Sequence, residues 1–204
     1  SSSAASDVYK RQFEALPTNV EPAEQTVKTC ANRLFMATND ARLIALDGLT
    51  GEVCPGFGTG GEVDLKAGVG KLSWAQEYQV SSPPAVVGDV VVVGSAVADN
   101  QRVDAPSGVV RGYDVRSGEL VWAFDLAPPD FDYEAGMVSE AGYALGTPNV
   151  WSGFAVDQKR DMIFLPTGNP APDYARNPGP DMAHYGSSVA VSYTHLTLPT
   201  TTSV

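Results

Sequence analysis

One short pattern occurs twice in this chain, and it constrains the fold more than any other feature. Residues 45–52 read ALDGLTGE and residues 112–119 read GYDVRSGE, and the second copy continues as LVW to Trp122. In each copy an apolar segment ends at an Asp, whose carboxylate can accept hydrogen bonds from turn amides. The Gly that precedes the final Glu of each copy supplies the positive φ that the corner requires. The pattern therefore predicts a strand, a tight turn and an outgoing strand at each copy.

The two copies are interpreted as parts of a repeat. Asp47 and Asp114 are 67 residues apart, which is longer than a plain propeller blade, so insertions must lie between them. A third copy begins at residues 188–190, and Trp122 on the outgoing strand is expected to dock on a neighbouring sheet. The alternative is two unrelated hairpins that share a common turn, but the Trp extension and the third start favour the repeat.

Strand patterns dominate the rest of the chain. Residues 85–94 contain a turn at Gly88-Asp89 and then four consecutive valines, which suit a strand buried on both faces. Further strand pairs are predicted at 33–38 with 42–47, at 108–113 with 119–124, and at 152–156 with 162–165. No segment carries a sustained helical period. With 20 Gly and 15 Pro among 204 residues, the sequence predicts an all-β fold with many tight turns.

The charge balance excludes one large class of partners. The chain has 13 basic and 24 acidic residues, a net charge of −11, so it would repel a phosphate backbone and no nucleic acid partner is expected. No stretch approaches the roughly 18 apolar residues of a membrane-spanning helix.

Both ends of the chain are interpreted as translated sequencing-adapter DNA. Residues 2–12 read SSAASDVYKRQ, the in-frame translation of a transposase adapter, and residues 191–200 read VSYTHLTLPT, which the reverse complement of the same DNA encodes. One DNA string, read in opposite senses, thus explains both ends. Residues 1–12 and 191–204 are therefore assigned as artefact and left out of fold reasoning, and residues 13–190 are the informative protein.

Longer stretches of the chain resemble one enzyme family. These are CANRLFMATNDARLIALDGLTGEVC, SSPPAVVGDVVVVGSAVADN, PSGVVRGYDVRSGELVWAFD and GTPNVWSGFAVDQKRDMIFLPTGNPAPDY. They are similar to quinoprotein dehydrogenases that bind pyrroloquinoline quinone (PQQ), in the membrane-bound glucose, quinate and shikimate branch. The resemblance implies a partial eight-bladed β-propeller of about three blades with tryptophan-docking motifs. Residues 13–190 would then be a fragment of the PQQ-binding propeller domain.

The resemblance also implies a cofactor floor and a metal ligand. Trp151, in TPNVW, is similar to the tryptophan beneath PQQ in this family, and Asn169, in TGNPAP, is similar to an Asn that binds calcium in the related alcohol dehydrogenases. A hairpin that turns near residues 158–159 would place Trp151 and Asn169 at the same end. The alternatives are a core or inter-blade tryptophan for Trp151 and a turn residue before proline for Asn169.

Four more residues follow as site candidates. Asp99, directly after the valine strand, matches the position of the family's metal-binding carboxylate, and Asn100 beside it is a second oxygen donor, so Ca²⁺ or Mg²⁺ is expected. Ser81 stands where relatives have a hydroxyl that faces a PQQ carboxylate, and Asn149 is a weaker candidate for the same contact. Asp99 could equally be a solvated loop residue, and Ser81 a turn cap.

The resemblance implies an activity and a location. The expected reaction is PQQ-dependent oxidation of a sugar, with glucose foremost, or of a cyclic polyol, with electrons passing to ubiquinone at the periplasmic face of the bacterial inner membrane. Membrane association would rest on an N-terminal region missing from the chain. The catalytic Asp and Lys would lie downstream, so no catalytic residue is assigned and the isolated fragment is expected to be inactive. The alternative is a non-catalytic propeller scaffold of the kind that assembles outer-membrane proteins.

Two motifs are set aside, and one covalent bond is predicted. Residues 56–61 fit G-x-G-x-x-G, but no helix follows them, so a dinucleotide site is not expected. His184, the one histidine outside the adapter-like ends, is interpreted as structural. Cys30 and Cys54 bracket the hairpin at 33–47, whose ends come back together, and a periplasmic setting is oxidising. A disulfide between them is therefore predicted, with two free thiols as the alternative.

Overall fold

The computed structural model describes residues 29–174 and 182–193, and their regular secondary structure is almost entirely β-strand. The strands are β1 (Arg33–Ala37), β2 (Arg42–Asp47), β3 (Glu62–Asp64), β4 (Tyr78–Gln79), β5 (Ala85–Val87), β6 (Val90–Val93), β7 (Ala96–Val97), β8 (Val110–Asp114), β9 (Leu120–Phe124), β10 (Ala155–Asp157), β11 (Met162–Pro166) and β12 (Val189–Tyr193), with a short 3₁₀ helix η1 (Met182–Tyr185). The predicted all-β class and the predicted strand pairs are confirmed.

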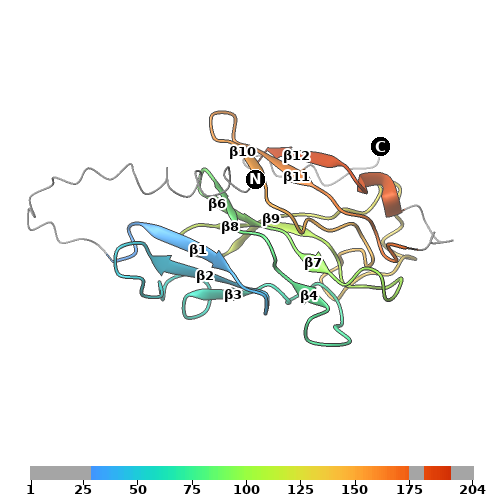
Figure 1. Ribbon diagram of the computed structural model, residues 1–204, viewed down its shortest axis with the longest axis horizontal. Coiled ribbons are helices and arrows are strands. Elements are labelled where there is room, and N and C mark those ends of the chain that lie inside the picture. Colours follow the sequence, from blue (N-terminus) through green and yellow to red (C-terminus); the bar gives the residue numbers. More distant parts are fainter. Residues whose placement is uncertain (1–28, 175–181, 194–204) are drawn as a thin grey trace, which may run out of the picture.

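The strands form successive antiparallel sheets. A four-stranded sheet has the order β5-β6-β8-β9, and two three-stranded sheets have the orders β1-β2-β3 and β10-β11-β12. The short strands β4 and β7 pair with each other. Figure 1 shows the three larger sheets following one another across the molecule in chain order, with β10–β12 along the upper edge of the view. Each of the three larger sheets takes its strands from one region of the chain, with β7 inserted between β6 and β8 of the four-stranded sheet, as expected of a propeller repeat. The number of blades stays a prediction.

The first copy of the repeated motif forms the predicted Asp-capped turn. The Oδ1 atom of Asp47 accepts hydrogen bonds from the backbone N–H groups of Leu49 and Thr50, at 2.8 and 3.2 Å. Gly51 closes the turn with a φ of 74°. Backbone N–H groups that point at the carboxylate, that of Cys30 foremost, lower the pKa of Asp47.

The second copy has the same geometry. The Oδ1 atom of Asp114 accepts hydrogen bonds from the backbone N–H groups of Arg116 and Ser117, at 2.8 and 2.7 Å, and Gly118 has a φ of 73°. The hydrogen bond from Ser117 is the main cause of the lowered pKa of Asp114. Both copies therefore form the same Asp-capped turn, as a structural repeat requires. Two unrelated hairpins that share a turn would have the same hydrogen bonds, so the repeat stays an interpretation.

Trp122 docks between two sheets, as its place in the motif predicted. The ring lies over Gly112 of β8, where a Cβ atom would approach Trp122 Cε2 to 2.5 Å. Only 8% of Trp122 is exposed, and it belongs to the same core cluster as Ile163 and Leu165 of β11. Because Gly112 has no side chain, the Trp122 ring fits against β8 and reaches the core shared with the next sheet.

The valine strand β6 separates two hydrophobic cores. Val91 and Val93 pack in the cluster shared with the first sheet, whereas Val90 and Val92 pack in the cluster shared with β11. All four side chains are buried. Successive side chains of a strand point to opposite faces, so an all-apolar strand serves both cores, as predicted from the sequence. The chain segments that leave the ends of these strands carry the site.

A disulfide joins Cys30 to Cys54, with their Cα atoms 5.8 Å apart. The bond closes the β1–β2 hairpin across 24 residues of sequence, and it confirms the prediction made from the position of the two cysteines.

No helix in the described ranges is long and apolar enough to cross a membrane.

The full-length protein is therefore expected to show no reactive thiol at positions 30 and 54 until it is reduced. The measurement is a thiol titration of protein unfolded in guanidinium without reductant, followed by peptide mapping of the labelled cysteines. A parallel sample treated with reductant serves as the control and should label at both positions. Labelling of Cys30 and Cys54 in the unreduced sample would contradict the assignment.

Candidate cofactor and metal site

Five of the six predicted site residues come together where the strands end. Ser81 follows β4, Asp99 follows β7, and Asn169 follows β11, while Asn149 and Trp151 lie on the segment that leads into β10. A pocket of about 330 Å³ opens among these segments. It is lined by Asp99, Trp151, Ser152, Pro166, Thr167, Gly168, Asn169, Asp173 and Ser187.

Direct contacts hold these segments in place. The Ser81 hydroxyl donates a hydrogen bond to the carbonyl of Trp151 at 2.9 Å, and the Asn149 Nδ2 atom donates to Asp99 Oδ2 at 3.0 Å. Gly94 lies so close to the Val150 carbonyl that a Cβ atom would approach it to 2.3 Å. The segment 149–151 is therefore fixed against both the loop between β4 and β5 and the end of β6. The Ser81 hydroxyl already donates its hydrogen bond to the Trp151 carbonyl. Its predicted contact with a cofactor carboxylate stays a prediction.

The Trp151 side chain is largely exposed among the described residues. Its exposed fraction is 57%, and the edge of its indole lies over Gly168, where a Cβ atom would be 3.1 Å from Trp151 Nε1. The backbone beneath it is anchored because Gly168 N donates to the Asn149 carbonyl at 2.8 Å. Trp151 is therefore outside the hydrophobic cores formed by the described residues, and its place beneath a cofactor stays a prediction. An exposed, supported indole at the mouth of a pocket is suited to stacking a flat ring system.

The carboxamide of Asn169 is held at both ends. Its Nδ2 atom donates to Asp173 Oδ1 at 2.7 Å, and its Oδ1 atom accepts from the Ser187 hydroxyl at 2.7 Å. Asp173 and Ser187 were not singled out in the sequence. The signal that was available is the spacing of Asn169 and Asp173 in a proline-rich loop, which places two oxygen-bearing side chains within reach of each other.

The pocket is electrostatically suited to a cation. Burial is the main cause that raises the pKa of Asp99; the nearby Asp173 carboxylate raises it further, and the hydrogen bond from Asn149 opposes both. Two carboxylates in one partly desolvated pocket repel each other, and a positive ion between them would offset that repulsion. Among the described residues no group of three or more His, Cys, Asp and Glu is placed to hold a metal, so a cation here needs carboxamide oxygens as well.

An unpaired buried oxygen adds a second sign of a ligand. Asn149 is 1% exposed, and its Oδ1 atom has no hydrogen-bond partner in the structure. The Asp99 carboxylate can only accept, so it fixes the amide with Nδ2 toward Asp99 and leaves Oδ1 free. A buried acceptor without a partner is costly unless a cation or a donor occupies the space beside it. Carboxylate and carboxamide oxygens are the ligands that Ca²⁺ and Mg²⁺ prefer, and the residues therefore fit the expected metal.

The sixth predicted site residue and the two features set aside in the sequence lie elsewhere. Asn100 is exposed, accepts a hydrogen bond from Gln101 Nε2 at 2.7 Å and does not line the pocket, so the structure does not bring it together with the other five. The glycine-rich stretch at 56–61 forms turns with no helix after it, as expected. His184 lies on η1 with its ring 4.5 Å from that of Tyr185.

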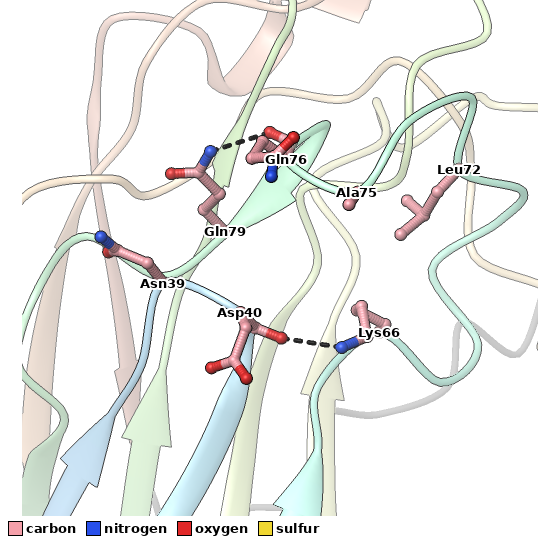
Figure 2. Close-up of a pocket in the computed structure, with 7 residues that line it drawn as sticks. All are labelled: Asn39, Asp40, Lys66, Leu72, Ala75, Gln76 and Gln79. Atoms are coloured by element: carbon pink, nitrogen blue, oxygen red, sulfur yellow. Dashed lines mark hydrogen bonds between the residues drawn. The ribbon is translucent and has the colours of Figure 1, made fainter.

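A second, larger pocket lies at the turn of the first hairpin. Figure 2 shows its lining, which consists of Asn39, Asp40, Lys66, Leu72, Ala75, Gln76 and Gln79, around about 620 Å³. Lys66 Nζ donates to the Asp40 carbonyl at 2.7 Å, and Gln79 Nε2 donates to the Gln76 carbonyl at 3.0 Å. None of the predicted site residues lines this pocket.

The comparisons with known proteins agree with one another. Residues 5–194 match the family model described as "PQQ: Glucose/ethanol/alcohol dehydrogenase, beta-propeller domain". The chain is 45% identical over 145 residues to the glycerol dehydrogenase large subunit of Gluconobacter thailandicus, covering 71% of this chain and 19% of that protein. It is 40% identical over 146 residues to the quinate/shikimate dehydrogenase (quinone) of Acinetobacter baylyi, covering 71% and 18%.

A glucose dehydrogenase and a solved structure complete the comparison. The chain is 35% identical over 156 residues to quinoprotein glucose dehydrogenase A of Acinetobacter calcoaceticus, covering 76% of this chain and 19% of that protein. The crystal structure of quinohemoprotein alcohol dehydrogenase from Comamonas testosteroni superposes with a TM-score of 0.50 at 22% identity, covering 69% of this chain and 20% of that one. The chain thus spans about a fifth of the length of the curated relatives that it matches.

Proposed function

Because the chain belongs to the PQQ-dependent dehydrogenase β-propeller family, we propose that it forms part of a quinoprotein that oxidises a polyhydroxylated alcohol or sugar. The family match confirms the resemblance drawn from the sequence motifs. The observation that carries the proposal is the gathering of Trp151, Asp99 and Asn169 around one pocket, with Asn149 bonded to Asp99 behind it. These residues come from separate stretches of the chain, and a scaffold has no use for an exposed indole beside a carboxylate.

Each residue has a distinct task in this proposal. Trp151 stacks under the flat cofactor, Asp99 and Asn169 hold a Ca²⁺ or Mg²⁺ ion through their oxygens, and Asn149 orients Asp99 and offers its free Oδ1 atom. Ser81 fixes the backbone of Trp151. Bound PQQ supplies the two-electron oxidant, and a cation beside its quinone oxygen makes it more electrophilic. No catalytic acid or base is assigned among the described residues.

The proposed substrate class is inferred from the chemistry shared among the relatives. Glycerol, quinate, shikimate and glucose all present adjacent hydroxyl-bearing carbons, so we propose a polyol or sugar without singling out glucose. The relative with 45% identity is named for glycerol, whereas the glucose dehydrogenase of Acinetobacter calcoaceticus is 35% identical. Electron transfer to ubiquinone at the periplasmic face of the inner membrane completes the proposal.

Reconstitution of the full-length protein is the test. Apoprotein incubated with PQQ and Ca²⁺ is expected to reduce an artificial dye when glycerol, quinate or glucose is added, and to reduce a short-chain ubiquinone analogue with the same substrate. Samples without PQQ, or with Ca²⁺ chelated, are the controls and should be inactive. Failure to bind PQQ would overturn the proposed function and favour a non-catalytic propeller. Binding without oxidation of any of the three substrates would overturn the proposed substrate class.

A further inference from the structure

Asp173 contacts both segments that carry the predicted metal ligands, although it is not among the predicted site residues. Its Oδ1 atom accepts the hydrogen bond from Asn169 Nδ2 at 2.7 Å, and its backbone N–H donates to the Asp99 carbonyl at 2.9 Å. It also lines the pocket together with Asn169 and Asp99. One residue therefore connects the loop after β11 to the loop after β7.

The side-chain contact determines which way the Asn169 amide faces. A carboxylate has no proton and can only accept, so Asp173 selects the Nδ2 end of the amide. The Oδ1 end then meets the Ser187 hydroxyl, which donates to it at 2.7 Å. Without Asp173 the amide could rotate by 180° about its last bond, because Ser187 can accept a hydrogen bond as well as donate one. A rotated amide would present a donor, which cannot bind a cation.

We propose that Asp173 is a positioning residue that holds the Asn169 carboxamide with its oxygen directed at the metal ion. The inference rests on the proposed function, since it assumes that Asn169 binds the ion that accompanies PQQ. Asp173 acts through Asn169, and it does so by accepting a hydrogen bond rather than by its charge. This places it among the outer groups of metal sites, whose removal typically weakens metal affinity by about tenfold to a hundredfold.

The test uses variants that separate the hydrogen bond from the charge. Asp173→Ala removes both, whereas Asp173→Asn keeps an oxygen that can accept from Asn169 Nδ2 and removes only the charge. The measured quantity is the Ca²⁺ concentration that gives half-maximal PQQ binding to full-length apoprotein, followed by quenching of tryptophan fluorescence. We expect Asp173→Ala to raise this concentration about tenfold, and we expect Asp173→Asn to stay within about twofold of the parent.

A double-mutant cycle shows whether Asp173 acts through Asn169. In the Asn169→Ala background, Asp173→Ala should raise the Ca²⁺ concentration no further, since the group that it positions is gone. If Asp173→Ala does not fold, Ser187→Ala is tested in its place. It should also raise the Ca²⁺ concentration needed for half-maximal PQQ binding. An equal loss in Asp173→Asn and Asp173→Ala would overturn the proposal and identify Asp173 as a charged ligand. Parent-like Ca²⁺ dependence of Asp173→Ala and Ser187→Ala would overturn it as well. If the parent itself binds no PQQ, the proposed function fails first.

Discussion

Asp99→Ala should raise the Ca²⁺ concentration needed for half-maximal PQQ binding by roughly a hundredfold or more in the full-length protein. The substitution removes a charged oxygen ligand and also leaves the Asn149 Nδ2 atom, which donates to Asp99 at 3.0 Å, without its acceptor. Asn169→Ala removes a neutral ligand only, so a smaller loss is expected from it. Asp99→Asn, which keeps an oxygen but loses the charge, should lie between the parent and Asp99→Ala.

A matched control removes the same charge from a place outside the site. Asp130 is exposed on the loop after β9 and does not line the pocket, so Asp130→Ala should leave the Ca²⁺ dependence within about twofold of the parent, because exposed charges are strongly screened. Urea denaturation of each apoprotein shows that the variants are folded. If Asp99→Ala reconstitutes at the same Ca²⁺ concentration as the parent, the metal assignment is wrong.

Local chemistry explains why the turns and strands could be predicted from the sequence. The carboxylates of Asp47 and Asp114 cap amides two and three residues away, so all the information for each corner lies within a few residues. The valine strand β6 is apolar at every position, and it is buried on both faces as such a strand must be. The disulfide followed from the closure of one hairpin.

The site was harder to predict because its geometry depends on contacts between distant segments. The loop after β11 is placed by the hydrogen bond from Asp173 N to the Asp99 carbonyl, across more than seventy residues. No local pattern reveals that bond, so Asp173 was missed. Asn100 was included because it follows Asp99 in sequence, but its side chain is exposed and bonded to Gln101. Neighbours in sequence in an irregular loop do not share a direction, unlike residues i and i+2 of a strand.

The register of the sheets supports the proposal that residues 191–204 are not native protein. The first residue of β1 pairs with Asp47 and the first residue of β6 pairs with Asp114, which are the two turn-capping aspartates. The first residue of β11, Met162, pairs with Tyr193. A tyrosine has no carboxylate with which to cap the following amides, so the third copy of the motif lacks its key residue at the position where the adapter-like sequence runs.

Replacing each of two tryptophans by alanine should change the free energy of unfolding by very different amounts. Trp122→Ala is expected to lower the free energy of unfolding by about 3–5 kcal/mol, because the ring is 8% exposed and fills the space over Gly112 between two sheets. Trp151→Ala should change it by less than about 0.5 kcal/mol, because more than half of that residue is exposed. Urea denaturation of the full-length apoprotein measures both values.

The two variants should rank in the opposite order when their loss of PQQ affinity is measured. Trp151→Ala removes the platform under the cofactor and should weaken PQQ binding by the roughly 0.5–1.5 kcal/mol of aromatic stacking plus the lost burial, with the Ca²⁺ over Mg²⁺ preference unchanged because no ligand oxygen is removed. Trp122→Ala, where it stays folded, should bind PQQ nearly as the parent does, since its ring packs away from the pocket with Ile163 and Leu165. A Trp151→Ala protein that loses stability like Trp122→Ala but keeps its PQQ affinity would show that Trp151 is a packing residue. The cofactor would then have to rest on some other surface of the propeller.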